Sequence, residues 1–411
     1  MLVVEPERLM KILASVPAGS RVVCSGNAAT PWTLVGVVDE ALSSYVLHAL
    51  NAHVGVPDRE GVTLETAFVG AGARNSSRLA YVPSRLSMVP RMYETVLPPD
   101  VVCLHTSVPR DGRVSLGTEV NVLPAAVDAV RRRGGLVLAQ LDPAMPYVFG
   151  DGELSVDVVD WAIEASDPPG SPRATSADDV ARQIAQRVAS RVGDGATLQM
   201  GIGEVPDAVV AGLLARRGMR VWSEMFSDGV LALERAGSLN SDVPLTASFL
   251  FGSAELYAWA DRNPRVRLLR TETTNDPSRI AANAAMVSIN TALQVDLFGQ
   301  VNASRIKGRI HSGFGGQTDF IVGALHSTKG QALIALQSWH PRADVSTVVP
   351  LVAEPVTSFQ PSAVITEQGA AELWGAAEKE QAHQLIEQAA HPSIRDELRE
   401  EAVALGLMAQ P

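Results

Sequence analysis

The chain has 411 residues, of which 46% are hydrophobic and 5% aromatic, and it carries a formal net charge of −11 at pH 7. This length predicts two or three domains, each large enough to bury a core. The acidic balance argues against nucleic acid as a partner, because a surface without a basic field cannot release counterions. The single dense basic run, at 131–133, precedes two glycines and is typical of the C-terminal end of a helix.

Strand-like and helical patterns alternate along the first half of the chain. An amphipathic helix is expected within residues 1–20, a strand at 21–24, and a helix from about Trp32, with Pro31 placed where a first-turn proline loses no hydrogen bond. The alternation predicts an α/β fold with mostly parallel sheets. Later segments with the same character are strand-like runs at 63–69, 101–104 and 136–140 and a helical pattern at 124–133.

Cys24 and Cys103 each lie in an apolar, strand-like run, which predicts buried free thiols rather than a disulfide. No metal is expected, because two cysteines without paired histidines make no zinc site and the eight histidines show no metal-ligand spacing. The N-terminus lacks a signal-peptide pattern, and no apolar run reaches about 18 residues. We therefore expect a cytoplasmic protein with no membrane partner.

Proline, glycine and serine cluster at 164–173, which is typical of a linker, and capping residues at 176–179 predict the start of a new helix. We therefore predict two domains, at 1–172 and 173–411.

The strand–loop–helix pattern of the N-terminus recurs after this boundary, with a strand at 196–200 and a helix at 207–214. In both halves a loop glycine precedes a proline by five positions, Gly26 before Pro31 and Gly201 before Pro206. This internal repeat, although weak, indicates two domains of related fold.

The segment 221–229 reads Val-Trp-Ser-Glu-Met-Phe-Ser-Asp-Gly, and an apolar helical run follows it. It predicts a buried strand whose C-terminal end presents Glu224 where a helix begins, which is where open α/β sheets place their chemistry. The alternative is an ordinary strand-end acid, with residues 223–228 merely capping the helix.

A second distinctive loop, 312–320, has three glycines in four positions, so its backbone N–H groups are open to an anion or a thioester oxygen. The alternative is a tight turn between strands. Lys329 stands before a strand-like run and is either a phosphate contact or an ordinary turn lysine. A further strand, 364–369, contains Glu367 near its end, and the charged C-terminal segment 378–406 is expected to be helical.

Several reaction types lack their motifs in this sequence, which has no Gly-x-Ser-x-Gly, Walker-type Gly-Lys-Ser/Thr, His-Glu-x-x-His or complete Gly-x-Gly-x-x-Gly pattern. What remains is a carboxylate accompanied by glycine loops. A glutamate can act as a covalent nucleophile on an activated acyl group, such as a thioester, when donors stabilise the oxyanion.

These residues resemble the acetyl-CoA hydrolase/transferase family, the class I coenzyme A transferases that include 4-hydroxybutyrate CoA-transferase. The resemblance implies two related α/β domains of the CoA-transferase (NagB/RpiA-like) fold with an active site in the cleft between them. It also implies acyl-CoA and a carboxylate as substrates, and a homodimer. It covers nearly the whole chain, and its most specific motifs lie at 198–209, 223–229, 286–297, 299–302, 312–320 and 366–369.

The resemblance implies a role for individual residues. Glu224 falls on the catalytic glutamate, which forms an acyl anhydride and then a glutamyl-CoA thioester. Asn275 matches an asparagine that polarises the thioester carbonyl, Glu367 matches an acid beside it, and Gly316 belongs to the loop that supplies an oxyanion-hole amide. The residues expected to bind CoA or to line its thioester are Gly201, Ile202, Gly203, Glu204, Val205, Ser312, Gly313, Gly315 and Lys329.

The chain departs from the common family pattern at Asp142, Ala284, Gln368 and Trp374, which leaves the acyl group open. Three functions are compatible with the sequence. The preferred one is a CoA-transferase that moves CoA between a short-chain acyl-CoA and a carboxylate such as acetate. The alternatives are an acyl-CoA hydrolase with the same glutamate and a non-catalytic acyl-CoA-binding protein. Retention of Glu224 with both glycine loops favours an enzyme.

Overall fold

The computed structural model describes residues 1–171 and 178–409, which form two compact units. Unit 1 comprises Met1–Pro172, Pro244–Asn275 and Ile310–Gly315, and unit 2 comprises Arg173–Val243, Asp276–Arg309 and Gly316–Pro411. The boundary predicted between residues 172 and 173 lies outside the described residues, so the division into domains 1–172 and 173–411 stays a prediction.

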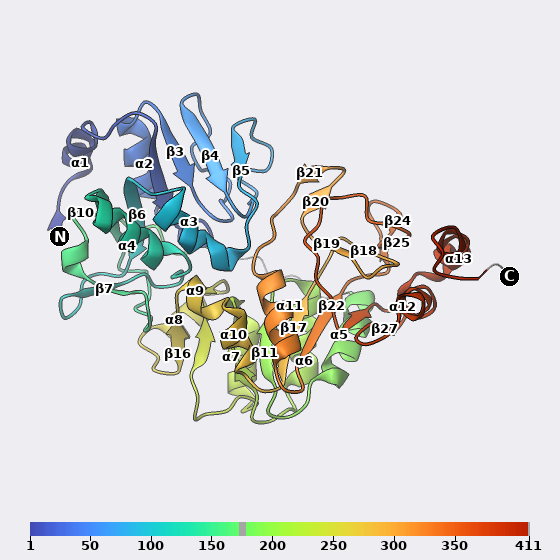
Figure 1. The fold of residues 1–411 in the computed structure, drawn as a ribbon. Helices are drawn as coiled ribbons and strands as arrows, with labels where there is room; N and C mark the ends of the chain where they lie inside the picture. Colours follow the sequence, from blue (N-terminus) through green and yellow to red (C-terminus); the bar gives the residue numbers. More distant parts are fainter. Residues whose placement is uncertain (172–177, 410–411) are drawn as a thin grey trace. The chain divides into compact units, whose positions relative to one another are not determined.

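Unit 1 is built on an eight-stranded sheet in which every neighbouring pair of strands is parallel (Figure 1). In spatial order the strands are β1 (Leu2–Val3), β10 (Trp161–Glu164), β8 (Leu136–Leu141), β6 (Val101–Thr106), β2 (Ser20–Cys24), β3 (Tyr45–His48), β4 (Val62–Thr66) and β5 (Leu79–Tyr81). Its helices are α1 (Pro6–Leu13), α2 (Trp32–Ala41), α3 (Val89–Thr95), α4 (Leu123–Arg133), α8 (Ala254–Ala260) and α9 (Thr271–Thr274). Its shorter strands are β7 (Arg113–Ser115), β9 (Glu153–Ser155), β14 (Leu245–Ala247), β15 (Phe249–Leu250) and β16 (Val266–Leu268).

Helices cover both faces of this sheet, as alternating strand residues require. Side chains of α1 and α2 form one core cluster with the β2 and β6 residues that include Cys24 and Cys103. The alternate residue Val23 is also fully buried, and α4 packs against β2, β6 and β8. The two cysteines are opposite each other on the neighbouring strands, and both are buried free thiols, as predicted.

The order of the strands reverses beside β2. The chain runs outward from β2 through β3 and β4 to β5, then returns to place β6 on the other side of β2. At such a topological switch point the loops after two neighbouring parallel strands lead away from each other and leave a crevice at the carboxyl ends of the strands. We call this side of a sheet its carboxyl edge. In unit 1 the loops at the switch point follow β2 and β6.

Unit 2 repeats this plan on a six-stranded sheet, which is parallel except for its last strand. In spatial order the strands are β12 (Arg220–Val221), β11 (Thr197–Met200), β17 (Met286–Asn290), β22 (Gln331–Ala335), β26 (Ala363–Ile365) and β27 (Ala370–Glu372). Its helices are α5 (Asp179–Arg191), α6 (Glu204–Leu213), α7 (Asp228–Arg235), α10 (Pro277–Ala281), α11 (Gln317–His326), α12 (Glu378–Gln384) and α13 (Arg395–Ala404). Short strands include β13 (Met225–Phe226), β18 (Gln294–Asp296), β19 (Val301–Asn302), β21 (Arg309–Ile310) and β25 (Val348–Val349).

The switch point of unit 2 lies between β11 and β17, because the chain passes from β11 outward to β12 and later returns with β17 on the other side. The glycine loop that begins at Gly201 therefore holds the position in unit 2 that the Gly26 loop holds in unit 1. The repeat found in the sequence thus corresponds to two loops at equivalent switch points.

Two predicted elements differ from the structure. The first helix covers only Pro6–Leu13, because residues 2 and 3 pair with β10 as an edge strand and Pro6 starts the helix. The glycine-rich loop after β21 leads into α11 and does not form a turn between strands. Among the described residues no helix is long and apolar enough to cross a membrane.

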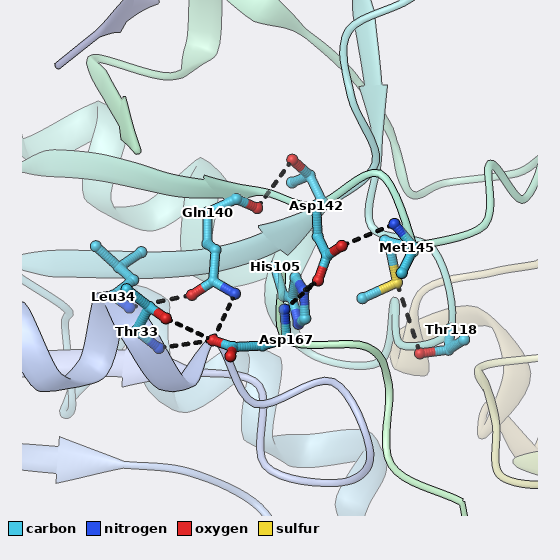
Figure 2. Close-up of polar contacts among 10 residues, drawn as sticks. Thr33, Leu34, His105, Thr118, Gln140, Asp142, Met145 and Asp167 are labelled. Carbon is cyan, nitrogen blue, oxygen red and sulfur yellow. Dashed lines mark hydrogen bonds and ion pairs between the residues drawn. The ribbon is translucent and has the colours of Figure 1, made fainter. Parts of the chain in front are cut away.

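A buried polar network ties the carboxyl ends of β6 and β8 to Asp167, within the segment predicted as a linker (Figure 2). His105 Nε2 donates to Asp142 Oδ2 at 3.2 Å, and neither side chain is exposed. The backbone N–H groups of Ala144 and Asp167 donate to the same carboxylate, each at 2.7 Å. The Asp167 carboxylate in turn accepts from Thr33, in the first turn of α2. Burial alone would raise the pKa of Asp142, but these hydrogen bonds outweigh it and lower the pKa.

We predict that Asp142→Asn lowers the free energy of unfolding by about 3 kcal/mol, because its amide nitrogen must face one of the N–H donors in a buried site. Urea denaturation at pH 7 would measure this. A lowered native pKa contributes stability above the unfolded pKa of aspartate and loses it as the pH falls, so the difference should shrink in acid. Asp111→Asn is the matched control, since this side chain is 92% exposed and its removal should change stability little. Equal stability of the two variants would contradict the prediction.

Candidate active site

Glu224 lies just beyond the carboxyl end of β12, between this strand and β13, and α7 begins four residues later. The ladder to β11 continues past the strand, since Trp222 N donates to Leu198 O at 3.1 Å and Ser223 Oγ donates to Met200 O at 3.3 Å. These bonds hold the segment that carries Glu224 alongside the end of β11. The side chain of Glu224 is half-buried, so it does not lie in a sealed apolar interior.

A small pocket in unit 2 connects this segment with the glycine loop. Gly201 lines it together with Ser223 and Met225, the two residues that flank Glu224. The other lining residues are Leu198, Met200, Pro206, Asp207, Val210, Val221, Phe226, Ser227 and Val230. Desolvation and the charge of nearby Asp228 raise the pKa of Asp207, although this side chain keeps contact with solvent. The pocket is therefore apolar on its floor and acidic at the first turns of α6 and α7.

The glycine loop itself leaves its backbone open. Gly203 has φ +122° and precedes the first turn of α6, a conformation that side chains with a Cβ rarely adopt. No atom lies within 4 Å of the Cβ position of Gly201 or of Gly203. Ile202 is 49% exposed, Glu204 and Val205 form the first turn of α6, and the N-cap residue Gly203 has no side chain to cap this helix. N–H groups at the start of a helix such as α6 are suited to an anion or a polarised oxygen.

The second glycine loop is packed tightly against the end of β4 in unit 1. Ser312 O accepts from Val69 N at 2.9 Å, and a Cβ on Gly313 would lie 2.5 Å from Ala67 O. Gly315 has φ +56° and lies against the ring of Phe68. Its neighbour Gly316 belongs to unit 2, where it is the N-cap residue of α11. The glycines here are required by close backbone approach, whatever else the loop does.

Asn275 ends the short helix α9 in unit 1 and is fully buried. Its backbone N–H donates to Thr271 O at 2.9 Å, and its side-chain oxygen accepts from Thr274 Oγ1 at 2.9 Å. The carboxamide is therefore held in one orientation.

Glu367 is at the tip of the β26–β27 hairpin, on the carboxyl edge of the unit 2 sheet. It accepts from Ser338 N at 3.0 Å and from Gln368 Nε2 at 3.1 Å, and Ser338 Oγ also donates to it. Four strand intervals separate β12 from β26, about 19 Å at the usual strand spacing. Glu367 and Glu224 thus share an edge of the sheet without being neighbours on it.

Lys329 lies at the opposite edge of this sheet, in the turn before the amino end of β22, with φ +60°. The parallel pairing of β22 with β17 and of β17 with β11 keeps it away from the Gly201 loop. Its position agrees with the ordinary turn lysine that the sequence left as an alternative.

The structure also bears on the other departures from the family pattern. Gln368 donates to Glu367, so it belongs to the hairpin-tip network. Trp374 is 62% exposed and lines a cavity of about 300 Å³ at the amino end of β26, the other edge of the sheet from Glu367. Ala284 lies before β17, where its carbonyl accepts from Thr197 Oγ1 at 3.1 Å. Asp142 belongs to the buried network of unit 1.

Two of the groups found at these sites were missed in the sequence. Ser338 holds Glu367, but a single serine after a strand resembles any other. Asp207 lines the pocket beside Glu224, and its spacing of four residues from Gly203 could have placed it on the first turn of α6. No group of three or more metal-ligating side chains occurs within residues 1–171 and 178–409.

The arrangement can support covalent acyl chemistry. The site offers the half-buried Glu224 carboxylate, a pocket beside it that Asp207 also lines, and backbone N–H groups at the same sheet edge. A carboxylate so placed can attack an activated carbonyl while backbone donors stabilise the negative oxygen.

Comparison with known proteins identifies the family and the class of reaction. Residues 252–402 match the acetyl-CoA hydrolase/transferase C-terminal domain. The chain is 34% identical to 4-hydroxybutyrate coenzyme A transferase of Clostridium kluyveri, over 95% of each sequence. It is 32% identical to succinyl-CoA:acetate/propanoyl-CoA:succinate CoA transferase of Fasciola hepatica, over 93% of this chain and 84% of the relative. Acetyl-CoA hydrolases, such as that of Candida albicans (27% identity over 61% of this chain and 50% of the relative), are also similar.

The fold is shared over the whole chain. The crystal structure of RipA from Yersinia pestis matches with a TM-score of 0.91 and 27% identity, covering 99% of this chain and 98% of that one. The extent of these similarities establishes the relationship: the chain belongs to the acetyl-CoA hydrolase/transferase family and is an enzyme of the CoA-transferase type.

Proposed function

We propose that this protein transfers CoA between a short-chain acyl-CoA and a carboxylate such as acetate, with Glu224 as the covalent nucleophile. The observation that carries the proposal is the position of Glu224, beside the Gly201 loop and flanked by two pocket-lining residues. The names of the similar transferases support the reaction class: one names 4-hydroxybutyrate, and the other pairs succinyl-CoA with acetate and propanoyl-CoA with succinate.

The proposed reaction exchanges carboxylates on one thiol. A Glu224 oxygen attacks the acyl carbon, the C–S bond breaks, and an acyl-glutamyl anhydride and a CoA thiolate result. The thiolate then attacks the glutamyl carbonyl carbon, which releases the first acid and leaves a glutamyl-CoA thioester. The second carboxylate attacks this thioester and repeats the two steps in reverse, so Glu224 is regenerated and no net proton is consumed.

The glycine loops and Asn275 are assigned to binding and to stabilisation of the oxyanion. The open loop of Gly201–Gly203 at the start of α6 would hold polar parts of CoA, and Gly316 and Asn275 would donate to the carbonyl oxygen as it gains charge. The fixed orientation of the Asn275 carboxamide supports this assignment, because a donor that need not reorganise stabilises the transition state most.

We predict that Glu224→Ala abolishes the covalent intermediate and that Glu224→Asp lowers kcat by on the order of 100-fold, since its carboxylate is one methylene too short. Wild-type protein incubated with acyl-CoA and then borohydride should show a reduced glutamyl adduct by mass spectrometry. Glu397→Ala, at an exposed glutamate of α13, is the control and should keep the adduct. A wild-type protein that binds acyl-CoA without any adduct would instead be a binding protein.

Transfer and hydrolysis use the same glutamate and differ in whether water reaches the intermediate. We expect CoA release to stay low without a carboxylate acceptor, and new acyl-CoA to form when acetate is added. Liquid chromatography of CoA species over time measures both. Release of free CoA at a rate unaffected by any carboxylate would identify a hydrolase.

The conformation of the Gly201 loop should control the binding of CoA. Gly203→Ala is predicted to raise the KM for acyl-CoA by on the order of tenfold, because about 1–3 kcal/mol of backbone strain would displace the loop. Gly406→Ala is the matched control, a glycine with φ +74° and open surroundings near the C-terminus. Steady-state kinetics should show an unchanged KM for acyl-CoA in the control. An unchanged KM in both variants would show that the loop does not contribute to CoA binding.

A further inference from the structure

Glu119 is a buried carboxylate at the switch point of the unit 1 sheet, and the proposed reaction does not use it. It follows β7 in the long connection from β6 to α4, and only 3% of its surface is exposed. The loop after β2, the other strand at the switch point, begins at Ser25. Glu119 thus stands where the two diverging loops of the carboxyl edge come closest.

The Glu119 carboxylate accepts its hydrogen bonds from N–H donors. Asn27 N donates to one carboxylate oxygen at 3.2 Å and Asn27 Nδ2 donates to the other at 2.9 Å. The backbone N–H of Gly26 and the side-chain amide of Asn121 also lower the pKa of this carboxyl group. A carboxylate that only accepts is matched to these donors in its ionised form, whereas a protonated one would present an O–H to an N–H.

One branch of this network runs through Asn27 to the next strand. Because the Asn27 nitrogen faces Glu119, its oxygen faces away and accepts from Asn51 Nδ2 at 2.9 Å. Asn51 follows β3 with φ +53°, and a Cβ on Gly70 would lie 2.3 Å from its carbonyl carbon. The backbone of Asn51 is therefore held in a sparsely populated conformation by its surroundings, as is common at functional edges.

The other branch leads to the turn that carries Asn275. Asn121 has φ +44°, and its side-chain oxygen accepts from Thr271 Oγ1 at 2.6 Å. Thr271 N donates to Asn121 O at 3.0 Å, so two bonds fix the first residue of α9. Thr271 O accepts from Asn275 N, which closes the turn. Asn121 stands two residues after Glu119 in the same loop, so this loop connects Glu119 to the turn that carries Asn275.

We infer that Glu119 is a positioning residue for CoA transfer: its ionised carboxylate holds the loop after β2 and the turn of Asn275 in their reactive arrangement, and protonation releases both. This rests on the proposed function, in which Asn275 donates to the thioester carbonyl. Titration of Glu119 would make the rate of transfer depend on pH, although no step of the transfer itself consumes a proton.

The charge state of Glu119 changes near neutral pH. Burial raises its pKa to about 7, against the lowering effect of the hydrogen bonds from Asn27, Gly26 and Asn121. The titratable groups whose pKa the charge of Glu119 affects are Cys24 of β2 and Tyr93 of α3. Burial raises the pKa of Cys24 to about 12 and that of Tyr93 well above its usual value, so both stay neutral in this range.

The test compares pH profiles of kcat/KM for transfer between pH 5.5 and 8.5. Wild type should gain activity as the pH rises through about 7. Glu119→Gln cannot titrate and sets its amide nitrogen against the donors of Asn27, so its activity should fall by on the order of 10–100-fold and lose this rise. Glu119→Asp should keep a rise. A Glu119→Gln profile that retains the wild-type rise would overturn the inference.

Glu65→Gln is the matched control, because Glu65 is also buried in unit 1 but is paired with Arg21 and His48. Although burial opposes it, these partners lower the pKa of Glu65 to about 2, so its loss should leave the rise near pH 7 unchanged. Loss of the rise in both variants would point to general damage to unit 1 and would also count against a specific role for Glu119.

Hydrogen exchange separates this inference from the proposed function. At one pH, the amides of Asn27 and Asn275 should exchange faster in Glu119→Gln than in wild type, while strand amides of unit 2 stay protected. If Glu119→Gln does not fold, wild type at pH 6 and pH 8, corrected for intrinsic exchange rates, gives the same comparison. Faster exchange without any transferase activity would refute the proposed function alone, whereas unchanged exchange would refute the role of Glu119.

Discussion

The chemistry that we propose for this protein depends on a short extension of a parallel ladder. β12 is only two residues long, yet the bonds from Trp222 N to Leu198 O and from Ser223 Oγ to Met200 O carry its pairing with β11 past the end of the strand. Without them the segment that carries Glu224 would be an ordinary loop at a sheet edge. With them, the carboxylate is held beside the end of β11, where the Gly201 loop leaves its backbone open. Placement of a nucleophile by a strand is more accurate than placement by a free loop.

The three buried carboxylates of unit 1 show how surroundings decide what such a group does. Glu65 is paired with the Arg21 cation, and Asp142 accepts from His105 and two backbone N–H groups; in both the pKa is lowered despite burial. Glu119 is held only by amides, whose dipoles compensate burial less than a cation does, and its pKa is raised. The first two therefore stay ionised at neutral pH and keep their contacts. In our inference the third loses its contacts when a modest fall in pH protonates it.

Much of the fold could be predicted from the sequence because its strands are uninterrupted apolar runs. The runs around Val22, Val102 and Val137 became central parallel strands, and the repeat of Gly26 and Gly201 identified the two switch-point loops. The segment of Glu224 was recognised from a strand-to-helix pattern, although the strand proved to be two short pieces. Roles for Asn275 and Glu367 came only from the family resemblance, and the homodimer stays a prediction.

What the sequence could not supply were contacts between residues far apart in the chain. Glu119 lies 92 positions from Asn27 and Asn121 lies 150 from Thr271, and no periodicity connects such pairs. Lys329 illustrates the reverse case, a residue with suitable chemistry that strand direction places at the other edge of the sheet from the Gly201 loop. Strand direction, and so the edge to which a loop belongs, follows from the pairing of strands and not from local composition.

The two switch-point loops occupy equivalent positions but are built for opposite purposes. In unit 1 a Cβ on Gly26 would lie 1.8 Å from Leu50 O, and Asn27 gives its donors to Glu119, so neighbouring protein groups fill the loop. In unit 2 nothing lies within 4 Å of the Cβ positions of Gly201 and Gly203, and no side chain caps α6. Buried backbone groups need hydrogen-bond partners. A loop whose backbone groups already bond to other protein groups cannot offer those groups to a ligand. In the proposed reaction, duplication of one fold therefore leaves one loop to fix catalytic geometry and the other to receive substrate.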